Sequence, residues 1–168
     1  MAECNALRNI RHRNLVKIFT CCSSMDYSGN QFKALVYEFM TNGSLDIWLH
    51  PVIDNQKKSR NLSLLQRLNV AIDVDSAIDY VHNHSAQPII HCDLKLSNIL
   101  LDNDMIASVS DFGLARLFPT IVDSSQKQTS TIGIKGSIGY AAPGNIFPIL
   151  LPKLPQHLYK YYLFFSIF

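Results

Sequence analysis

Hydrophobic residues recur along this chain with more than one period, and the clearest period begins at Ser63. From there, apolar residues follow at helical spacing: Leu64, Leu65, Leu68, Ala71, Ile72, Ile78 and Val81. Ser63 and Gln66 have the spacing of a capping box, in which each side chain bonds the backbone of the other residue. The pattern predicts a long helix with one buried face. Asp75 interrupts that face, and because an unpaired buried carboxylate is costly, we expect it to weaken the helix.

Two apolar runs of strand length precede this helix, LVKIFTCC at 15–22 and FKALVYEF at 32–39. The residues between them, SSMDYSGN, are typical of a turn, so we expect an antiparallel pair of strands. A short helix is expected over 42–50, ended by Pro51, and another helix over 2–9.

The second half of the chain begins with shorter elements. NILLD and ASVSD predict two short strands around a turn at 102–105. The polar stretch 117–138 reads as a long loop, a length that usually marks a functional or disordered segment. After Pro143 the composition changes. Residues 144–168 are apolar, but prolines and lysines interrupt them too often for a membrane span.

Composition narrows the class of protein. The 168 residues, 48% hydrophobic and 17% charged, suit one globular domain. A net charge of +2 is too small to indicate binding to nucleic acid or to an anionic membrane. Four cysteines without a C-x-x-C pair indicate reduced thiols in a cytosolic setting. The polar N-terminus predicts no secretory signal.

The candidate chemistry lies in HCDLKLSNIL (91–100) and SDFGLAR (110–116). Transfer of a phosphoryl group needs a carboxylate that orients the attacking hydroxyl, metal ions that neutralise the phosphates, and cations at the transferred group. An H-R-D-x-x-x-x-N loop and a D-F-G sequence supply such groups. Here Asp93 and Asn98 keep the loop spacing, and Asp111 begins the D-F-G. Alone, each would be read equally well as a turn or cap residue.

Four segments in order make chance negligible: LRNIRHRNLVKI, LVYEFMTNGSL, HCDLKLSNILL and GSIGYAAP. Together they resemble protein kinase catalytic domains, and more narrowly those of plant leucine-rich-repeat receptor-like serine/threonine kinases. The resemblance covers residues 1–143, from the helix that carries Glu3 to a variant of the Ala-Pro-Glu motif. It leaves 144–168 as an apolar tail outside the family. It implies an α+β fold, a partial kinase with the remnant of the N-terminal-lobe sheet and the first part of the helical C-terminal lobe.

The resemblance also implies ATP and Mg²⁺ as cofactors and assigns roles. Asp93 would orient the substrate hydroxyl, and Lys95 would contact the transferred phosphate. Asn98 and Asp111 would hold Mg²⁺ through hard oxygen donors. The adenine side would be formed by Tyr37, Glu38, Met40 and Leu100. Structural or regulatory positions would be Glu3, His91, Cys92, Phe112, Gly113 and Ser137. Three further hydroxyls are either phosphorylation sites or solvent-facing residues: Thr129, Ser130 and Thr131.

The chain departs from the family pattern at several positions. Cys92 stands where many kinases have an Arg that binds a phosphate on the activation loop, which points to the non-RD subclass. Gly144 replaces the Glu of the Ala-Pro-Glu motif. These residues contain no G-x-G-x-x-G, and no V-A-I-K lysine stands before Glu3. We therefore expect a truncated kinase domain that is inactive by itself.

The predicted function is that of a serine/threonine protein kinase segment, whose family transfers phosphate from ATP to protein hydroxyls. The alternative is an inactive fragment that acts as an interaction or decoy module. A small-molecule phosphotransferase is a weaker third interpretation. The family implies an unidentified protein substrate, no nucleic-acid partner, and a parent receptor anchored in the plasma membrane with its kinase on the cytosolic face. No transmembrane helix is expected in this chain.

Overall fold

The computed structural model describes residues 10–51, 61–85 and 87–117. Several expectations lie outside these ranges and stay predictions: the helix over 2–9, the loop 118–138, the tail 144–168, and the roles of Glu3, Thr129, Ser130, Thr131 and Ser137. Within the described ranges, no helix is both long enough and apolar enough to cross a membrane.

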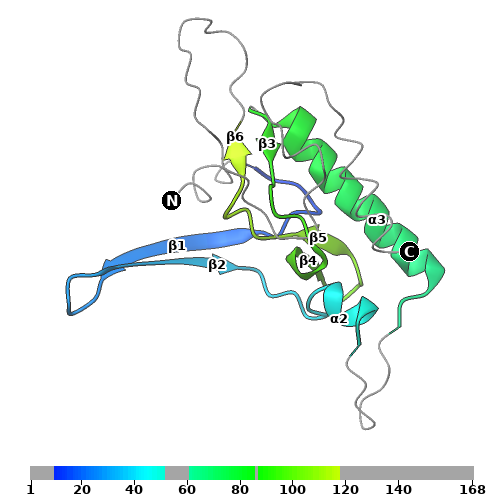
Figure 1. Ribbon diagram of the computed structural model, residues 1–168, viewed down its shortest axis with the longest axis horizontal. Coiled ribbons are helices and arrows are strands. Elements are labelled where there is room, and N and C mark those ends of the chain that lie inside the picture. The colour runs from blue at the N-terminus through cyan, green and yellow to red at the C-terminus, as the bar shows by residue number, and fades with distance from the viewer. Residues whose placement is uncertain (1–9, 52–60, 86, 118–168) are drawn as a thin grey trace, which may run out of the picture.

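An antiparallel hairpin opens the described chain, as the sequence predicted. Its strands are β1 (Ile18–Met25) and β2 (Gln31–Tyr37). The turn is shorter than the expected 23–30, because the Asp26 carboxylate accepts the backbone N–H of Asn30 at 2.7 Å and closes the connection early. Figure 1 shows the hairpin reaching away from the rest of the molecule.

The long helix α3 spans Leu64–Asp79 and continues as a π-helical turn over Tyr80–His84. The predicted capping box is confirmed. The Ser63 hydroxyl accepts the backbone N–H of Gln66 at 3.2 Å, and the Gln66 side chain accepts the backbone N–H of Ser63 at 2.9 Å. The expected short helix before Pro51 is also present, as α2 (Asp46–Leu49).

The buried face of α3 is only partly the face that the apolar pattern predicted. The helix buries Val70, Val74, Ala77 and Ile78. Four residues expected inside are instead 42–72% exposed: Leu64, Leu65, Leu68 and Ile72. Asp75 lies on the exposed side, so the expected burial of its carboxylate was wrong. The apolar residues of this helix spread around its circumference, and their spacing alone did not identify the side that packs.

Two small antiparallel pairs lie between the hairpin and α3. The pair β4 (Ile99–Leu101) and β5 (Ala107–Val109) was expected, whereas the pair β3 (Ile89–Ile90) and β6 (Arg116–Leu117) was not. The residues at the centre of the core are at most 2% exposed: Leu45, Val70, Val74, Val81, Leu96, Ile99, Leu101 and Val109.

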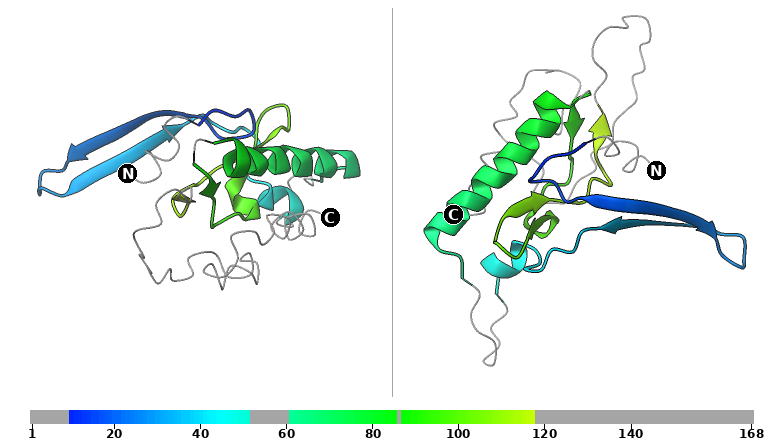
Figure 2. Two further views of the ribbon diagram at one scale, coloured as in Figure 1. Left: turned by 90° about the horizontal axis from the view of Figure 1, so that it is seen from above. Right: turned by 180° about the vertical axis from the view of Figure 1, so that it is seen from behind.

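Strand β5 joins the segment before the hairpin to α3. Asn14 is fully buried, and its Nδ2 donates to the carbonyl of Ala107 at 3.0 Å. The backbone N–H of Val109 donates to the Asn14 carbonyl at 2.9 Å. From the other side, the Asp73 carboxylate of α3 accepts the backbone N–H of Ala107 at 3.0 Å. Figure 2 shows the result, with the hairpin and α3 on opposite sides of the small strands.

Candidate active site

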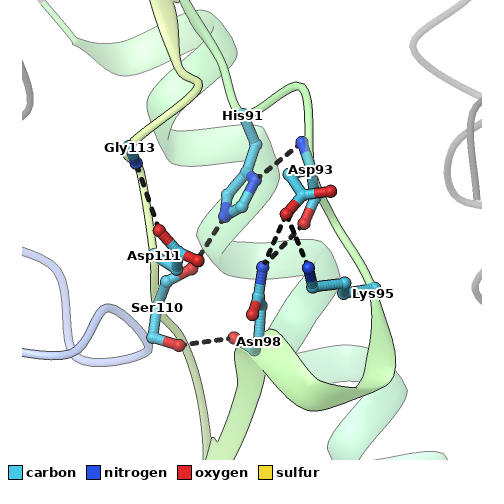
Figure 3. Close-up of polar contacts among 7 residues, drawn as sticks. All are labelled: His91, Asp93, Lys95, Asn98, Ser110, Asp111 and Gly113. Carbon is cyan, nitrogen blue, oxygen red and sulfur yellow. Dashed lines mark hydrogen bonds and ion pairs between the residues drawn. The ribbon is translucent and has the colours of Figure 1, made fainter. Parts of the chain in front are cut away.

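His91 follows β3 and connects two separate segments. It is 3% exposed, and its Nδ1 accepts the backbone N–H of Asp93 at 3.2 Å. Its Nε2 lies 2.8 Å from the carbonyl of Ser110, as Figure 3 shows. Burial lowers the pKa of His91, so the neutral ring is favoured. A proton on Nε2 satisfies both contacts, because Nδ1 is then the acceptor.

Asp93 lies at the centre of this loop and is 8% exposed. Lys95 places its Nζ 2.8 Å from Oδ2 of Asp93. The Asn98 Nδ2 donates to the Asp93 carbonyl at 2.9 Å and lies 3.3 Å from the same carboxylate oxygen, Oδ2. The paired cation and the amide offset the cost of burying this carboxylate. The structure thus brings together three residues that the sequence had singled out.

Asn98 ends a short 3-10 helix, Leu96–Asn98, whose geometry presents its side chain to the loop. The backbone N–H of Asn98 donates to the Lys95 carbonyl at 2.9 Å. With Nδ2 turned toward Asp93, an assignment that follows from the hydrogen-bond network, the amide oxygen points away from that carboxylate. We call His91, Asp93, Lys95, Asn98 and Ser110 the loop cluster.

Asp111 lies two residues after the end of β5, directly after Ser110. Its φ of 59° lies in the left-handed region, which Asp tolerates better than most residues, and its exposed carboxylate accepts the N–H of Gly113 at 3.3 Å. Phe112 is 3% exposed, and its ring lies 4.5 Å from the His91 ring, measured between centroids. The D-F-G residues are therefore anchored to the loop cluster through Phe112, while the Asp111 carboxylate stays accessible.

Cys92 also has a left-handed backbone, with φ of 65°. Its thiol donates to the carbonyl of Ile90 at a long 3.5 Å. Burial raises the pKa of the thiol, and the nearby Arg116 only partly opposes that effect. A thiol that stays protonated is a poor nucleophile, so Cys92 has the character of a packed residue.

Three of the residues expected on the adenine side lie at the end of β2 or just after it. Tyr37, the last residue of that strand, is half-buried. Glu38 is bonded twice to Lys17: its backbone N–H donates to the Lys17 carbonyl at 3.0 Å, and its carboxylate accepts the Lys17 N–H at 2.6 Å. Met40 is buried, and its carbonyl accepts the N–H of Gly43 at 3.1 Å.

The connection after Met40 meets β4, which brings Leu100 to the same region. Gly43 accepts the backbone N–H of Leu101 at 2.8 Å, and Ser44 forms an isolated antiparallel bridge with Leu100. Leu100 itself is half-buried. Strand β4 therefore carries Leu100 next to the chain that follows the hairpin, and it begins one residue after Asn98.

Sequence reasoning missed three polar residues that hold this region together. Ser110 bonds both His91 and Asn98, Asn14 bonds β5, and Asp73 ties α3 to β5. Asn14 and Asp73 have partners far away in sequence, so no local pattern indicates them. Ser110 stands directly before the D-F-G, which was its only available signal.

Metal ligands in this region would come from few protein groups. Among the described side chains, no cluster of three His, Cys, Asp or Glu residues has metal-binding geometry. Besides the Asp93 carboxylate, which is paired with Lys95, this region offers the amide oxygen of Asn98 and the carboxylate of Asp111. A small set of hard oxygen ligands suits Mg²⁺, which keeps waters and often takes its other ligands from phosphates.

The chain is similar in sequence to known protein kinases. The protein kinase domain family matches residues 1–150. The chain is 60% identical over 146 residues to a probable LRR receptor-like serine/threonine-protein kinase of Arabidopsis thaliana, with 85% of this chain covered. It is 54% identical over 142 residues to the receptor kinase-like protein Xa21 of Oryza sativa subsp. japonica, with 84% covered. It is 53% identical over 148 residues to the LRR receptor-like serine/threonine-protein kinase EFR of Arabidopsis thaliana, with 85% covered. The chain spans 14% of the length of each of these relatives.

Proposed function

This chain belongs to the protein kinase domain family, and on that premise we propose that residues 91–113 form the catalytic half of a site that transfers phosphate from ATP to protein serine and threonine hydroxyls. The observation that carries the proposal is the contact set of Asp93, Lys95 and Asn98. Phosphoryl transfer asks the protein for positioning and electrostatic stabilisation rather than for covalent chemistry. A preorganised carboxylate, cation and amide meet that need.

Asp93 takes the role of orienting the substrate hydroxyl and accepting its proton. Its carboxylate is held in place by Lys95 and by Asn98, so it needs little rearrangement when a hydroxyl arrives. The Lys95 side chain is 27% exposed, which lets its Nζ reach a transferred phosphate while it stays near Asp93. Lys95 at this position is also the feature that favours serine and threonine as acceptors.

Asn98 and Asp111 are the proposed Mg²⁺ ligands. The residues fit the ion, because an amide oxygen and a carboxylate are hard donors and the Asp111 carboxylate is exposed. When bound, Mg²⁺ would neutralise charge on the phosphates of ATP. The hydrogen bonds from Asn98 Nδ2 to Asp93 fix which end of the amide is available as a ligand.

The adenine ring of ATP is assigned to the region between β2 and β4. The N–H of Glu38 and the carbonyl of Met40 already have partners within the chain. The groups assigned to adenine are therefore the Glu38 carbonyl and the Met40 N–H, with Tyr37 behind them and Leu100 below the ring. The bonds between Glu38 and Lys17 would hold this connection against the start of β1.

The parent protein is proposed to be a receptor-like kinase that is anchored in the plasma membrane and acts on protein substrates at its cytosolic face. The printed names of the relatives, which describe receptor-like and receptor kinase-like proteins, support this proposal. Cys92 in place of the Arg next to the catalytic Asp supports assignment to the non-RD subclass. A net charge of +2 is too small to support a nucleic-acid partner.

Binding of Mn²⁺, a spectroscopic substitute for Mg²⁺, tests the metal part of the proposal. Water-proton relaxation measures the dissociation constant of Mn²⁺ for the purified chain. Asp111→Asn should raise that constant about tenfold or more, because a charged ligand is lost. Asp104→Asn, which neutralises an exposed carboxylate in the β4–β5 turn, is the matched control. Equal weakening by both substitutions would contradict the assignment of Asp111.

A second candidate is that the 168 residues act alone as an inert or decoy module. One observation favours it: the described strands beside the adenine region form only a two-stranded sheet, β1 with β2. The two candidates differ in a radiolabelled-ATP assay on the purified chain. Because these 168 residues contain no G-x-G-x-x-G sequence whose amides could bind the phosphates, we expect transfer by the purified chain to be slower than by a complete kinase domain by at least about a hundredfold. Efficient transfer that Asp93→Asn abolishes would exclude the inert module.

A further inference from the structure

Ser110 stands between the two proposed Mg²⁺ ligands, directly before Asp111 in sequence and beside Asn98 in space. Its hydroxyl donates to the Asn98 carbonyl at 2.9 Å, and its backbone N–H donates to the same carbonyl at 2.8 Å. Its own carbonyl accepts a hydrogen bond from Nε2 of His91 at 2.8 Å. Figure 3 shows the Ser110 hydroxyl meeting the backbone of Asn98, with His91 approaching from the other side.

These contacts hold Asn98 at its backbone carbonyl and at its side-chain amide. The Asn98 carbonyl takes two hydrogen bonds from Ser110, while the Asn98 amide donates to Asp93. A backbone N–H is available from any residue except proline, but the additional bond needs a side-chain hydroxyl. The hydroxyl therefore restricts the Asn98 backbone beyond what the strand pairing provides. The side chain of Asp111 begins one residue away, so the same bond also limits the separation of the two ligands.

We infer that Ser110 is a positioning residue for the metal site, through its hydroxyl bond to Asn98. The inference rests on the proposed function, because it takes Asn98 and Asp111 as the ligands. Groups that hold ligands in place contribute to metal affinity even when they never touch the metal. Loss of one hydrogen bond of ordinary strength corresponds to about a two- to tenfold change in a dissociation constant.

The test compares the full chain with Ser110→Ala, Ser110→Thr and Ser97→Ala. Ser97→Ala removes an exposed hydroxyl next to Asn98 and is the matched control. Water-proton relaxation gives the Mn²⁺ dissociation constant of each variant, and thermal unfolding gives its stability. Ser110→Ala should weaken Mn²⁺ binding about two- to tenfold, Ser110→Thr should restore it to within about twofold, and Ser97→Ala should leave it unchanged.

A second readout does not depend on metal. In nuclear magnetic resonance spectra of the metal-free chain, the side-chain NH₂ signals of Asn98 should shift in Ser110→Ala and return toward their original positions in Ser110→Thr. Unchanged signals in Ser110→Ala would overturn the inference, and so would unchanged Mn²⁺ affinity in a chain whose Asp111→Asn variant binds weakly. That last result would leave the proposed function intact. If Asp111→Asn also binds Mn²⁺ normally, the metal assignment itself fails and the positioning role fails with it.

Discussion

The loop cluster and the β1–β2 hairpin obtain their order in different ways. In the loop cluster, His91, Asp93 and Asn98 are buried, and each is hydrogen-bonded to another residue of the loop or to Ser110, which follows β5. In the hairpin, strand pairing supplies most of the order, and large apolar side chains such as Phe19 and Phe32 are 59% and 58% exposed. The proposed catalytic groups thus lie in the part of the described chain that is held by buried hydrogen-bonded side chains.

The physical reason for the difference is whether another secondary-structure element packs against the region. Strand β5 packs against α3 on one side and pairs with β4 on the other, and Asp73 adds a hydrogen bond between helix and strand. The hairpin is a two-stranded sheet within the described residues, and an isolated sheet of this kind is marginally stable in water. Substitutions should therefore have large effects on stability near the loop cluster and small effects in the hairpin.

The largest effect is expected at Ile99, which has none of its surface exposed. Ile99→Ala should lower the free energy of unfolding by about 2–5 kcal/mol, because it leaves a cavity next to the loop cluster. Phe32→Ala is the matched substitution in the hairpin, and we expect it to cost about 0.5 kcal/mol or less. Urea denaturation of both variants measures the difference. Similar losses for the two would show that the hairpin is packed as firmly as the core.

Asn14 should show the next largest effect. Asn14→Ala removes the donor to the Ala107 carbonyl and leaves that buried acceptor without this bond, which typically costs about 1–3 kcal/mol. Asn30→Ala removes an amide that donates to Asp26 in the exposed hairpin turn and should cost less. Urea denaturation again gives both values. A larger loss for Asn30→Ala would reverse the comparison between the two regions.

The buried His91 makes stability near the loop cluster depend on pH. Burial lowers its pKa in the folded chain below the ordinary value of 6.5 that applies after unfolding. Between the two pKa values the unfolded chain binds more protons, so the free energy of unfolding should fall as pH drops below about 6.5. The slope is at most about 1.4 kcal/mol per pH unit for one histidine.

Denaturation midpoints at about pH 7.5 and pH 5.5 check this slope, with His91→Gln as the control that should flatten it. His12 contributes with the same sign, because burial and the adjacent Arg13 lower its pKa too, so some dependence should remain in the control. A stability that rises as the pH falls through this window would show that His91 is not buried in its neutral form.

The smallest effect is expected at Asp75. The sequence pattern predicted that Asp75→Ala would stabilise the chain, but the residue is exposed. The free energy of unfolding should therefore change by no more than about 0.5 kcal/mol in either direction. Thermal and urea unfolding of the variant measure the change. A gain well above that value would restore the original expectation of a buried carboxylate.

Local chemistry made several parts of the structure predictable. The capping box of Ser63 and Gln66 located the start of α3, because both bonds lie within one turn of chain. The turn between β4 and β5 was predicted from its polar residues. The loop spacing identified Asp93 and Asn98, the family resemblance added Lys95, and the structure brings the three residues together. The pairing of β3 with β6 was not predicted, because two-residue strands carry almost no periodic signal.

The sequence by itself determined which residues carry the candidate chemistry, since the order and spacing of Asp93, Asn98 and Asp111 are properties of a linear motif. The tertiary structure alone decided which face of α3 is buried and which polar residues hold the motif in place. Ser110, Asn14 and Asp73 act through partners on other elements. Hydrogen bonds between distant segments depend on how those segments pack, and no pattern confined to one stretch of chain encodes that packing.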